Sequence, residues 1–229
     1  MTYIKITDRQ KSWAIRQMPQ GRELKNLGIR NLFRIYCEGE NTEPEYFKSF
    51  PINTETRVVA IGLGRSKTAL VEKTIELLNR DQLLKRQKNY DADRQLWVVF
   101  DYDVRNEENE EFDFNQAVDL AHRKGLQVAY SNDSFELWFL LHSRYHNTAL
   151  TRREYYETLS SELNCNYEDE GKTKEFSKSL YHIFLPAQKD AIQNAKRLYD
   201  EQQHLNYHDQ NPCTTVFLLV EELNKCLKK

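Results

Sequence analysis

Two short acidic clusters have residue types and positions that could do chemistry. Glu38 follows the apolar segment 32–37, and Asp101 and Asp103 follow the apolar segment 96–100. Such runs are typical of strands buried on both faces of a parallel sheet, whose carboxyl ends meet at one edge. Three carboxylates at that edge would repel one another without a cation between them, and oxygen ligands suit Mg²⁺, with Mn²⁺ as a second possibility. The pattern predicts a metal-dependent phosphoryl-transfer site.

The spacing of the two aspartates strengthens this interpretation. In an extended segment Asp101 and Asp103 point the same way, while Tyr102 faces the opposite side. Together with Glu38 they could hold one or two Mg²⁺, orient a phosphodiester, activate water and neutralise the departing oxygen. We expect Glu38 to be a ligand and a general acid or base, and the two aspartates to hold the cation.

Two further acids have an equally good structural explanation. Thr42 and Glu45 have the spacing of a capping box, so a helix is expected from residue 42 to about residue 50. Glu43 lies near the start of this helix, where the helix dipole favours a carboxylate with or without metal. Glu136 lies three residues after Asp133, the spacing of a capping box at the start of another helix. For both glutamates, metal ligand and helix cap stay open as alternatives.

The basic segment GLGRSKT resembles a phosphate-cradling loop but lacks the GxxxxGK[ST] spacing, so we do not expect this chain to hydrolyse nucleotides. Arg65 and Lys67 within it are expected to contact a nucleic-acid backbone. Two histidine pairs at i,i+4 spacing lack the glutamate of an HExxH site, and aromatic residues in helices most often belong to a core. Packing and surface roles are therefore expected for His142, His146, His204, His208, Tyr155, Tyr156 and Tyr181.

The elements that must position these residues alternate along the first two thirds of the chain. Apolar and β-branched runs predict strands at 32–37, 57–61, 96–100 and 127–130. Helical spacing predicts helices at 42–50, within 66–87, from 114 to a stop at Gly125, and at 136–142. This alternation predicts an α/β fold with a parallel sheet between helical layers. Further helices are expected at 151–163, 187–203 and 214–227, without another strand.

Composition limits the class of protein. The chain has 229 residues, 39% hydrophobic and 30% charged, which is globular, and its net charge of −2 argues against a generally basic nucleic-acid binder. Residues 1–30 nevertheless hold seven Lys or Arg against two acids, whereas 101–114 holds seven acids. No apolar run exceeds five residues and charges interrupt the N-terminus, so we expect no membrane span, no signal peptide and a cytoplasmic protein. Reduced thiols are expected at Cys37, Cys165, Cys213 and Cys226.

Four segments carry a resemblance to a known family. YCEGENTEPEYF, WVVFDYD, VAYSNDSFELWFLLH and NPCTTVFLLVEEL together resemble the RloB family, associated with bacterial restriction and antiviral loci, from about residue 32 to residue 227. That family is similar to TOPRIM domains, the α/β metal-binding fold of topoisomerases, primases and overcoming-lysogenization-defect nucleases. The resemblance implies that Glu38, Asp101 and Asp103 coordinate Mg²⁺. It also implies that Glu43 matches a second acid of the nucleases, although the spacing between Glu38 and Glu43 is one residue longer than in those relatives. The partner that the resemblance implies is an ABC-type ATPase.

Together these observations predict three regions: a basic arm (1–30), a TOPRIM-like α/β core (31–146) and a helical C-terminal extension packed on the core (147–229). The predicted function is a Mg²⁺-dependent endonuclease that acts on DNA or RNA in antiphage defence together with the ATPase. The alternative is a non-catalytic regulatory or binding subunit with a degenerate TOPRIM site. Ligase or primase chemistry is disfavoured, because no nucleotidyl-transfer lysine motif is present.

Overall fold

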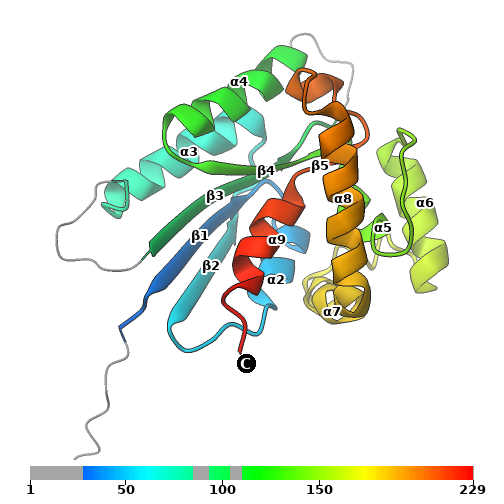
Figure 1. Cartoon of the computed structure of the whole chain (residues 1–229), viewed down its shortest axis with the longest axis horizontal. Helices are drawn as coiled ribbons and strands as arrows, with labels where there is room; N and C mark the ends of the chain where they lie inside the picture. Colours follow the sequence, from blue (N-terminus) through cyan, green and yellow to red (C-terminus); the bar gives the residue numbers. More distant parts are fainter. Residues whose placement is uncertain (1–27, 85–92, 104–109, 229) are drawn as a thin grey trace, which may run out of the picture.

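The computed structural model describes residues 28–84, 93–103 and 110–228 (Figure 1). A five-stranded sheet in the order β2-β1-β3-β4-β5 forms its centre. The first four strands pair in parallel and the fifth pairs antiparallel with β4. The strands are β1 (Asn31–Cys37), β2 (Thr56–Gly62), β3 (Asp93–Asp101), β4 (Gln127–Asn132) and β5 (Cys213–Thr214). The predicted α/β fold with a mostly parallel sheet is confirmed, whereas its likeness to a TOPRIM domain stays a prediction.

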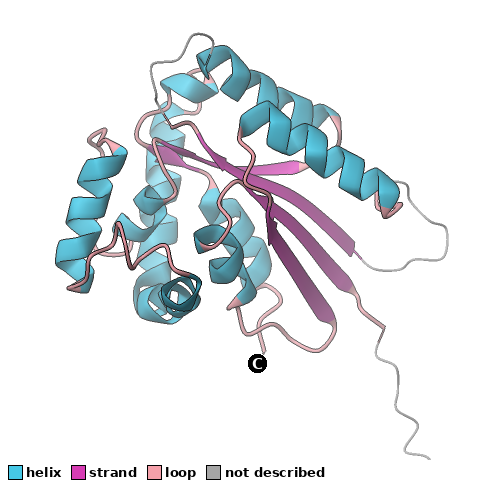
Figure 2. Ribbon diagram, turned by 180° about the vertical axis from the view of Figure 1, so that it is seen from behind, coloured by secondary structure: helices cyan, strands magenta, loops and turns pink. Residues whose placement is uncertain are grey.

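Helices cover both faces of the sheet (Figures 1 and 2). On one face lie α3 (Lys67–Arg80) and α4 (Glu110–Arg123). The other face carries α2 (Thr42–Lys48), α5 (Glu136–Leu140) and α9 (Val216–Asn224). Outside this second layer pack α6 (Arg152–Leu163), α7 (Lys174–Phe184) and α8 (Gln188–Gln202), with short 3₁₀ turns at Leu185–Ala187 and Tyr207–Asp209.

The central strands are apolar on both sides because both sides are covered. In β3, Trp97 and Val99 belong to the core under α2, α5 and α9, whereas Val98 and Phe100 belong to the core under α3 and α4. The alternation continues past the end of β3, because Tyr102 packs in the core under α3 and α4, with Val98 and Phe100. The predicted opposite orientation of Tyr102 is therefore confirmed.

Two details of the predicted chain path were wrong. β5 was not predicted, since two residues are too few for a periodic pattern and its pairing depends on contacts with β4. Helix α7 was also missed, although its buried face is readable in the spacing of Leu180, Tyr181 and Phe184, and the Thr173 side chain caps it by accepting a hydrogen bond from Phe176 N.

Two predicted capping boxes are absent. At α2 the helix begins at Thr42, one residue earlier than a Thr42 cap requires, and Glu45 instead pairs with Lys48 at 2.9 Å. At α5 the helix begins at Glu136 itself, and no side chain caps it. In both places the backbone enters the helix at a different residue from the one that the motif predicts, so Glu136 is not the third helical residue that a box needs. For Glu136 the role of metal ligand stays a prediction.

The helices after residue 150 share a core with the sheet. One continuous apolar cluster joins residues of β1, α2 and α5 to residues of α6, α7, α8 and α9. At its centre the indole nitrogen of Trp138 donates a hydrogen bond to the Tyr46 hydroxyl at 3.0 Å. The helical region therefore packs on the sheet through a shared core, and the predicted boundaries near residues 30 and 146 stay predictions.

The side chains that were expected to pack do so. His142 is buried, with Nδ1 2.9 Å from the Trp138 carbonyl oxygen, and burial lowers the pKa of its imidazole to about 4. The three tyrosines expected in the core are buried, and the four cysteines are free thiols. Within the described residues, no helix is both long enough and apolar enough to cross a membrane. The predicted basic arm lies outside the described residues, apart from its last three positions.

Candidate functional site

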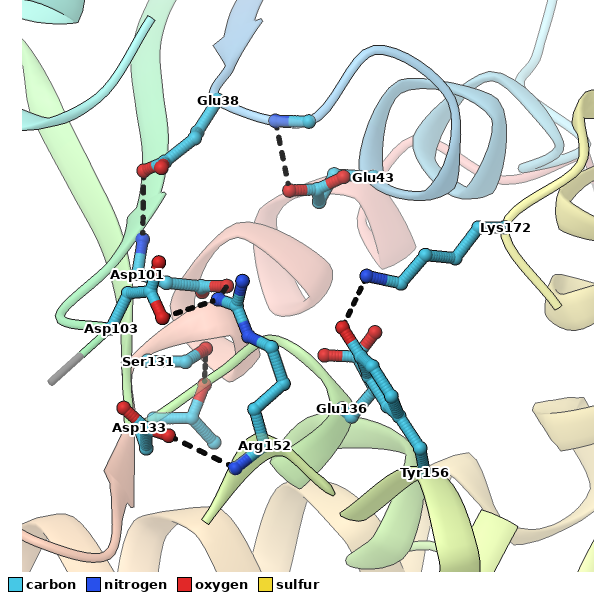
Figure 3. Close-up of polar contacts among 12 residues, drawn as sticks. Glu38, Glu43, Asp101, Asp103, Ser131, Asp133, Glu136, Arg152, Tyr156 and Lys172 are labelled. Carbon is cyan, nitrogen blue, oxygen red and sulfur yellow. Dashed lines mark hydrogen bonds and ion pairs between the residues drawn. The ribbon is translucent and has the colours of Figure 1, made fainter. Parts of the chain in front are cut away.

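The candidate site lies at the carboxyl edge of the parallel strands. Glu38 follows β1 directly, and its backbone N–H donates to the Val99 carbonyl oxygen of β3 at 2.9 Å. Asp101 ends β3 and pairs in register with Ser131 of β4. The Glu38 carboxylate therefore reaches β3, where Oε2 accepts a hydrogen bond from Asp101 N at 3.4 Å (Figure 3). The structure brings together the ends of the two strands that the sequence singled out.

A cation that was not predicted lies between the two aspartates. Nη2 of Arg152 is 3.3 Å from Asp101 Oδ2 and 3.4 Å from Asp103 Oδ1, so one nitrogen joins both carboxylates (Figure 3). Asp103 has left the extended conformation, with φ of 50°, yet its carboxylate still reaches the same guanidinium as Asp101. The backbone N–H of Arg152 donates to Asp133 Oδ2 at 3.1 Å, which anchors the first turn of α6 to the site.

A partly open cavity of about 310 Å³ adjoins these residues. It is lined by Glu38, Gly39, Glu40, Asn41, Thr42, Glu43, Asp101, Phe135, Glu136, Arg152 and Lys172. Its acidic residues come from the ends of β1 and β3 and from the starts of α2 and α5, whereas its cations come from α6 and from the loop before α7. Acidic and cationic groups from several elements therefore line one space.

Both weaker candidates from the sequence line this cavity. Glu43 is 6% exposed, and its Oε1 accepts a hydrogen bond from Gly39 N at 3.1 Å. A Cβ at Gly39 would lie 2.1 Å from the Glu43 carboxylate, so a larger residue at this position would have to displace that carboxylate. Glu136 is 4% exposed, and its Oε1 accepts a hydrogen bond from the Tyr167 hydroxyl at 3.4 Å. A neutral donor therefore holds each carboxylate at the cavity wall.

Lys172 is a second cation that lines the cavity. Its ammonium donates a hydrogen bond to the Tyr156 hydroxyl and lies 4.4 Å from the centre of the same ring (Figure 3). Its carbonyl oxygen accepts a hydrogen bond from the Asn41 side chain at 3.3 Å, which ties this loop to the loop after β1. Sequence reasoning missed both Arg152 and Lys172, because neither has a motif and both lie in the region expected to be a helical extension.

The donor chemistry of the site fits a hard divalent cation, because every acidic group at its wall offers carboxylate oxygens. In the arrangement of the described residues, however, no group of three or more His, Cys, Asp or Glu side chains is placed to hold a metal ion. The guanidinium of Arg152 stands between the two aspartates that such an ion would join. The carboxylate ligands are therefore of the right type for a divalent cation, but Arg152 pairs with two of them, Asp101 and Asp103.

Burial dominates the electrostatics of the acids. It raises the pKa of Glu38 to about 7, against the opposing effect of the hydrogen bond from Asp101 N, and Glu43 raises it further. Burial also raises the pKa of Glu43, with Glu136 adding to the shift. It raises the pKa of Asp101 as well, while Arg152 acts in the opposite direction. The site is therefore unfavourable for negative charge unless a cation is present.

This electrostatic arrangement predicts how stability depends on pH in EDTA. A carboxylate whose pKa is raised on folding binds more protons in the folded chain, so its contribution favours folding at low pH. The free energy of unfolding should fall as the pH rises from about 4.5 to about 7, as Glu38 loses its proton. Urea unfolding at several pH values measures this, and Glu38→Gln should flatten the slope. A slope unchanged in the variant would show that Glu38 does not titrate in this range.

The two basic residues of GLGRSKT differ in their surroundings. Arg65 is exposed, as an ionic contact with nucleic acid would require. Lys67 is only 6% exposed, and its ammonium pairs with Glu110 at 3.0 Å, joining the starts of α3 and α4. Lys67 therefore has a structural role at this place, and a contact with nucleic acid stays a prediction for both residues.

The comparisons with known proteins gave one match. A family model described as RloB-like protein matches residues 33–223, which covers most of the chain. The matched range includes the acids Glu38, Glu43, Asp101 and Asp103 and the cations Arg152 and Lys172. No curated protein and no solved structure matched the chain.

Proposed function

The chain belongs to the RloB-like family, and from this premise we propose that it is a metal-dependent endonuclease of the TOPRIM type in antiphage defence. The observation that carries the proposal is the cavity at the carboxyl edge of the sheet, which is lined both by acids and by the cations Arg152 and Lys172. An open α/β sheet places its ligands at this edge. A phosphodiester and the cation that compensates its charge would each find complementary groups there.

Individual residues would have distinct tasks. Glu38, Asp101 and Asp103 would hold the cation, and Glu43 and Glu136 are close enough to the same cavity to add ligands. A bound Mg²⁺ or Mn²⁺ would supply a Lewis acid for the phosphoryl group and would lower the pKa of water. Lys172 would contact a phosphate oxygen, because it lines the same cavity. Glu38 would accept or donate a proton through its carboxylate.

The proposed partner is a separately encoded ABC-type ATPase. Its support is the division of labour that the family resemblance implies, together with a GLGRSKT segment whose spacing does not make a nucleotide-binding loop. The proposed substrate is a nucleic acid, DNA or RNA, since the chemistry of a phosphodiester is common to both.

The experiment is a cleavage assay with the full chain, with and without an ABC-type ATPase encoded beside its gene. Plasmid DNA and total RNA are incubated with Mg²⁺, with Mn²⁺ and with EDTA. We expect cleavage with metal, none with EDTA, and a loss on the order of 10²-fold or more for Glu38→Gln, the range of a lost acid–base group. Equal cleavage by wild type and variant would contradict the assignment of the site.

One observation favours the second candidate, a non-catalytic subunit with a degenerate site. Arg152 already neutralises Asp101 and Asp103, as a permanent internal substitute for a metal ion would. This function predicts that the purified chain binds nucleic acid but never cuts it, with either metal and with the ATPase present. The open cavity beside Asp101 favours the nuclease, because a purely structural ion pair needs no such space.

A further inference from the structure

We propose that Arg152 is an internal cation that occupies the bridging position between Asp101 and Asp103 until a divalent cation displaces it, after which its guanidinium turns to the phosphate of the substrate. This inference rests on the proposed function for the identity of the ion and of the substrate. It assigns a regulated, two-position role to a residue of the helical region that no motif singled out.

The contact geometry is that of a bridge. A guanidinium binds a single carboxylate most strongly through two parallel N–H donors. Here a single nitrogen, Nη2, is shared between two carboxylates at 3.3 Å and 3.4 Å. A divalent cation that joins two aspartates would occupy a position of the same kind, between one oxygen of each. Arg152 and a metal ion would therefore compete for the same oxygens.

The pairing of Arg152 is incomplete, which makes displacement feasible. Its Nε is buried, yet among the described residues it finds no hydrogen-bond partner. A buried donor without a partner is destabilising. Burial opposes the charge of Arg152, and Asp101 and Asp103 more than compensate, so the pKa of the guanidinium lies above its ordinary value. A guanidinium stays protonated in proteins, so displacement would change only the location of the charge.

The two aspartates need a cation at all times. Each is 8% exposed, and Glu38 lies beside them. Removing a partner from buried charges leaves an uncompensated charge in a poorly solvated place, which is strongly destabilising. Exchange of Arg152 for a divalent ion keeps the charges compensated throughout, whereas departure of Arg152 alone does not. Metal binding and movement of Arg152 are therefore coupled.

The cavity offers space for a second position of the Arg152 side chain. Its side chain is 31% exposed and lines the cavity, so it can leave the aspartates without crossing the core. Its backbone stays fixed, because its N–H is bound by Asp133 and the preceding Thr151 forms a capping box with Glu154. In the cavity the planar guanidinium would present paired donors to a phosphate, for which arginine is well suited. Metal loading would thus release an arginine to the substrate.

The test uses Arg152→Met in the full chain, with metal binding and metal-free stability as readouts. Arg153→Met is the matched control, because Arg153 is the next residue of α6, with a side chain 84% exposed and paired only at the surface with Glu157. Mn²⁺ affinity is measured by calorimetry, and thermal unfolding is followed in EDTA and in Mn²⁺.

We expect Arg152→Met to bind Mn²⁺ at least about tenfold more tightly than wild type, equivalent to about 1.4 kcal/mol. Its melting temperature in EDTA should fall, because two buried carboxylates lose their cation, and Mn²⁺ should restore it. Arg153→Met should match wild type in both measurements. Mn²⁺ affinity that is unchanged or weaker in Arg152→Met, with no rescue of stability by metal, would overturn the inference.

A second measurement covers the case in which Arg152→Met does not fold. In the wild-type chain, the side-chain Nε–H resonance of Arg152, assigned with Arg152→Lys, should shift on titration with Mg²⁺; a resonance that does not respond would overturn the inference. These readouts are independent of cleavage. If Arg152→Met binds metal more tightly but wild type shows no nuclease activity, the inference stands and the proposed function is wrong. If wild type cleaves nucleic acid but Arg152→Met has the same metal affinity as wild type, the proposed function stands and the inference is wrong.

Discussion

Replacing Asp101 by asparagine is expected to abolish divalent-cation binding and to reduce nucleic-acid cleavage by about 1,000-fold or more, equivalent to about 4 kcal/mol of transition-state stabilisation. Asp101 is the acid that ends β3, lines the cavity, contacts Arg152 and lies beside Glu38. Asparagine keeps the shape of the side chain and removes its charge. Because Asp103 still pairs with Arg152, the folded chain should persist.

The matched control is Asp119→Asn, an exposed carboxylate of α4 away from the cavity. This variant should bind Mn²⁺ and cleave as wild type does. Cleavage rates are measured under single-turnover conditions at saturating Mn²⁺, with circular dichroism to verify folding. Asp101→Asn with wild-type cleavage would remove this carboxylate from the active site and leave the second, non-catalytic candidate in a stronger position.

Replacing Trp138 by alanine is expected to lower the free energy of unfolding by about 3–5 kcal/mol, the range for deleting a fully buried aromatic side chain. Trp138 is 0% exposed, donates to the Tyr46 hydroxyl and packs edge-on against His142. The loss combines a cavity in the shared core with a buried hydroxyl deprived of its donor.

The same experiment tests whether the helical region is a separate unit. Urea unfolding followed by circular dichroism should show one transition, shifted to lower denaturant as a whole, because the apolar cluster around Trp138 joins the sheet to α6–α9. Leu218→Ala on α9, at a side chain 39% exposed, should cost less than about 0.5 kcal/mol. Two separate transitions, with the sheet unfolding independently of the helices, would support the predicted boundary near residue 146.

The sequence was informative about the sheet because its strands are long apolar runs with a clear period. Cys37 and Phe100 end such runs, and the residues after them, Glu38 and Asp101, lie at the carboxyl edge for a topological reason that holds in any parallel sheet. Their proximity could therefore be predicted without knowledge of any contact across the chain.

The remaining features depend on contacts that no local pattern contains. The capping boxes at Thr42 and Asp133 had the correct residue types, but the backbone enters each helix at a different residue. Arg152 was ordinary in sequence, as the first residue of an amphipathic helix, and only the packing of α6 beside α5 brings it to the aspartates. Lys172 reaches the cavity for a similar reason, through a loop that is bound by Asn41.

The acids and the cations that line the cavity come from different parts of the chain, which limits how the helical region can be replaced. The acids belong to the first part of the chain, and the counter-charges Arg152 and Lys172 belong to the last. The carbonyl oxygen of Lys172 is held by Asn41, in the turn between Glu38 and Glu43. The helical region is thus not exchangeable on its own. A chimera that joins this sheet to the helices of another protein needs cations at the positions of Arg152 and Lys172, or the acids of the cavity will lack their counter-charges.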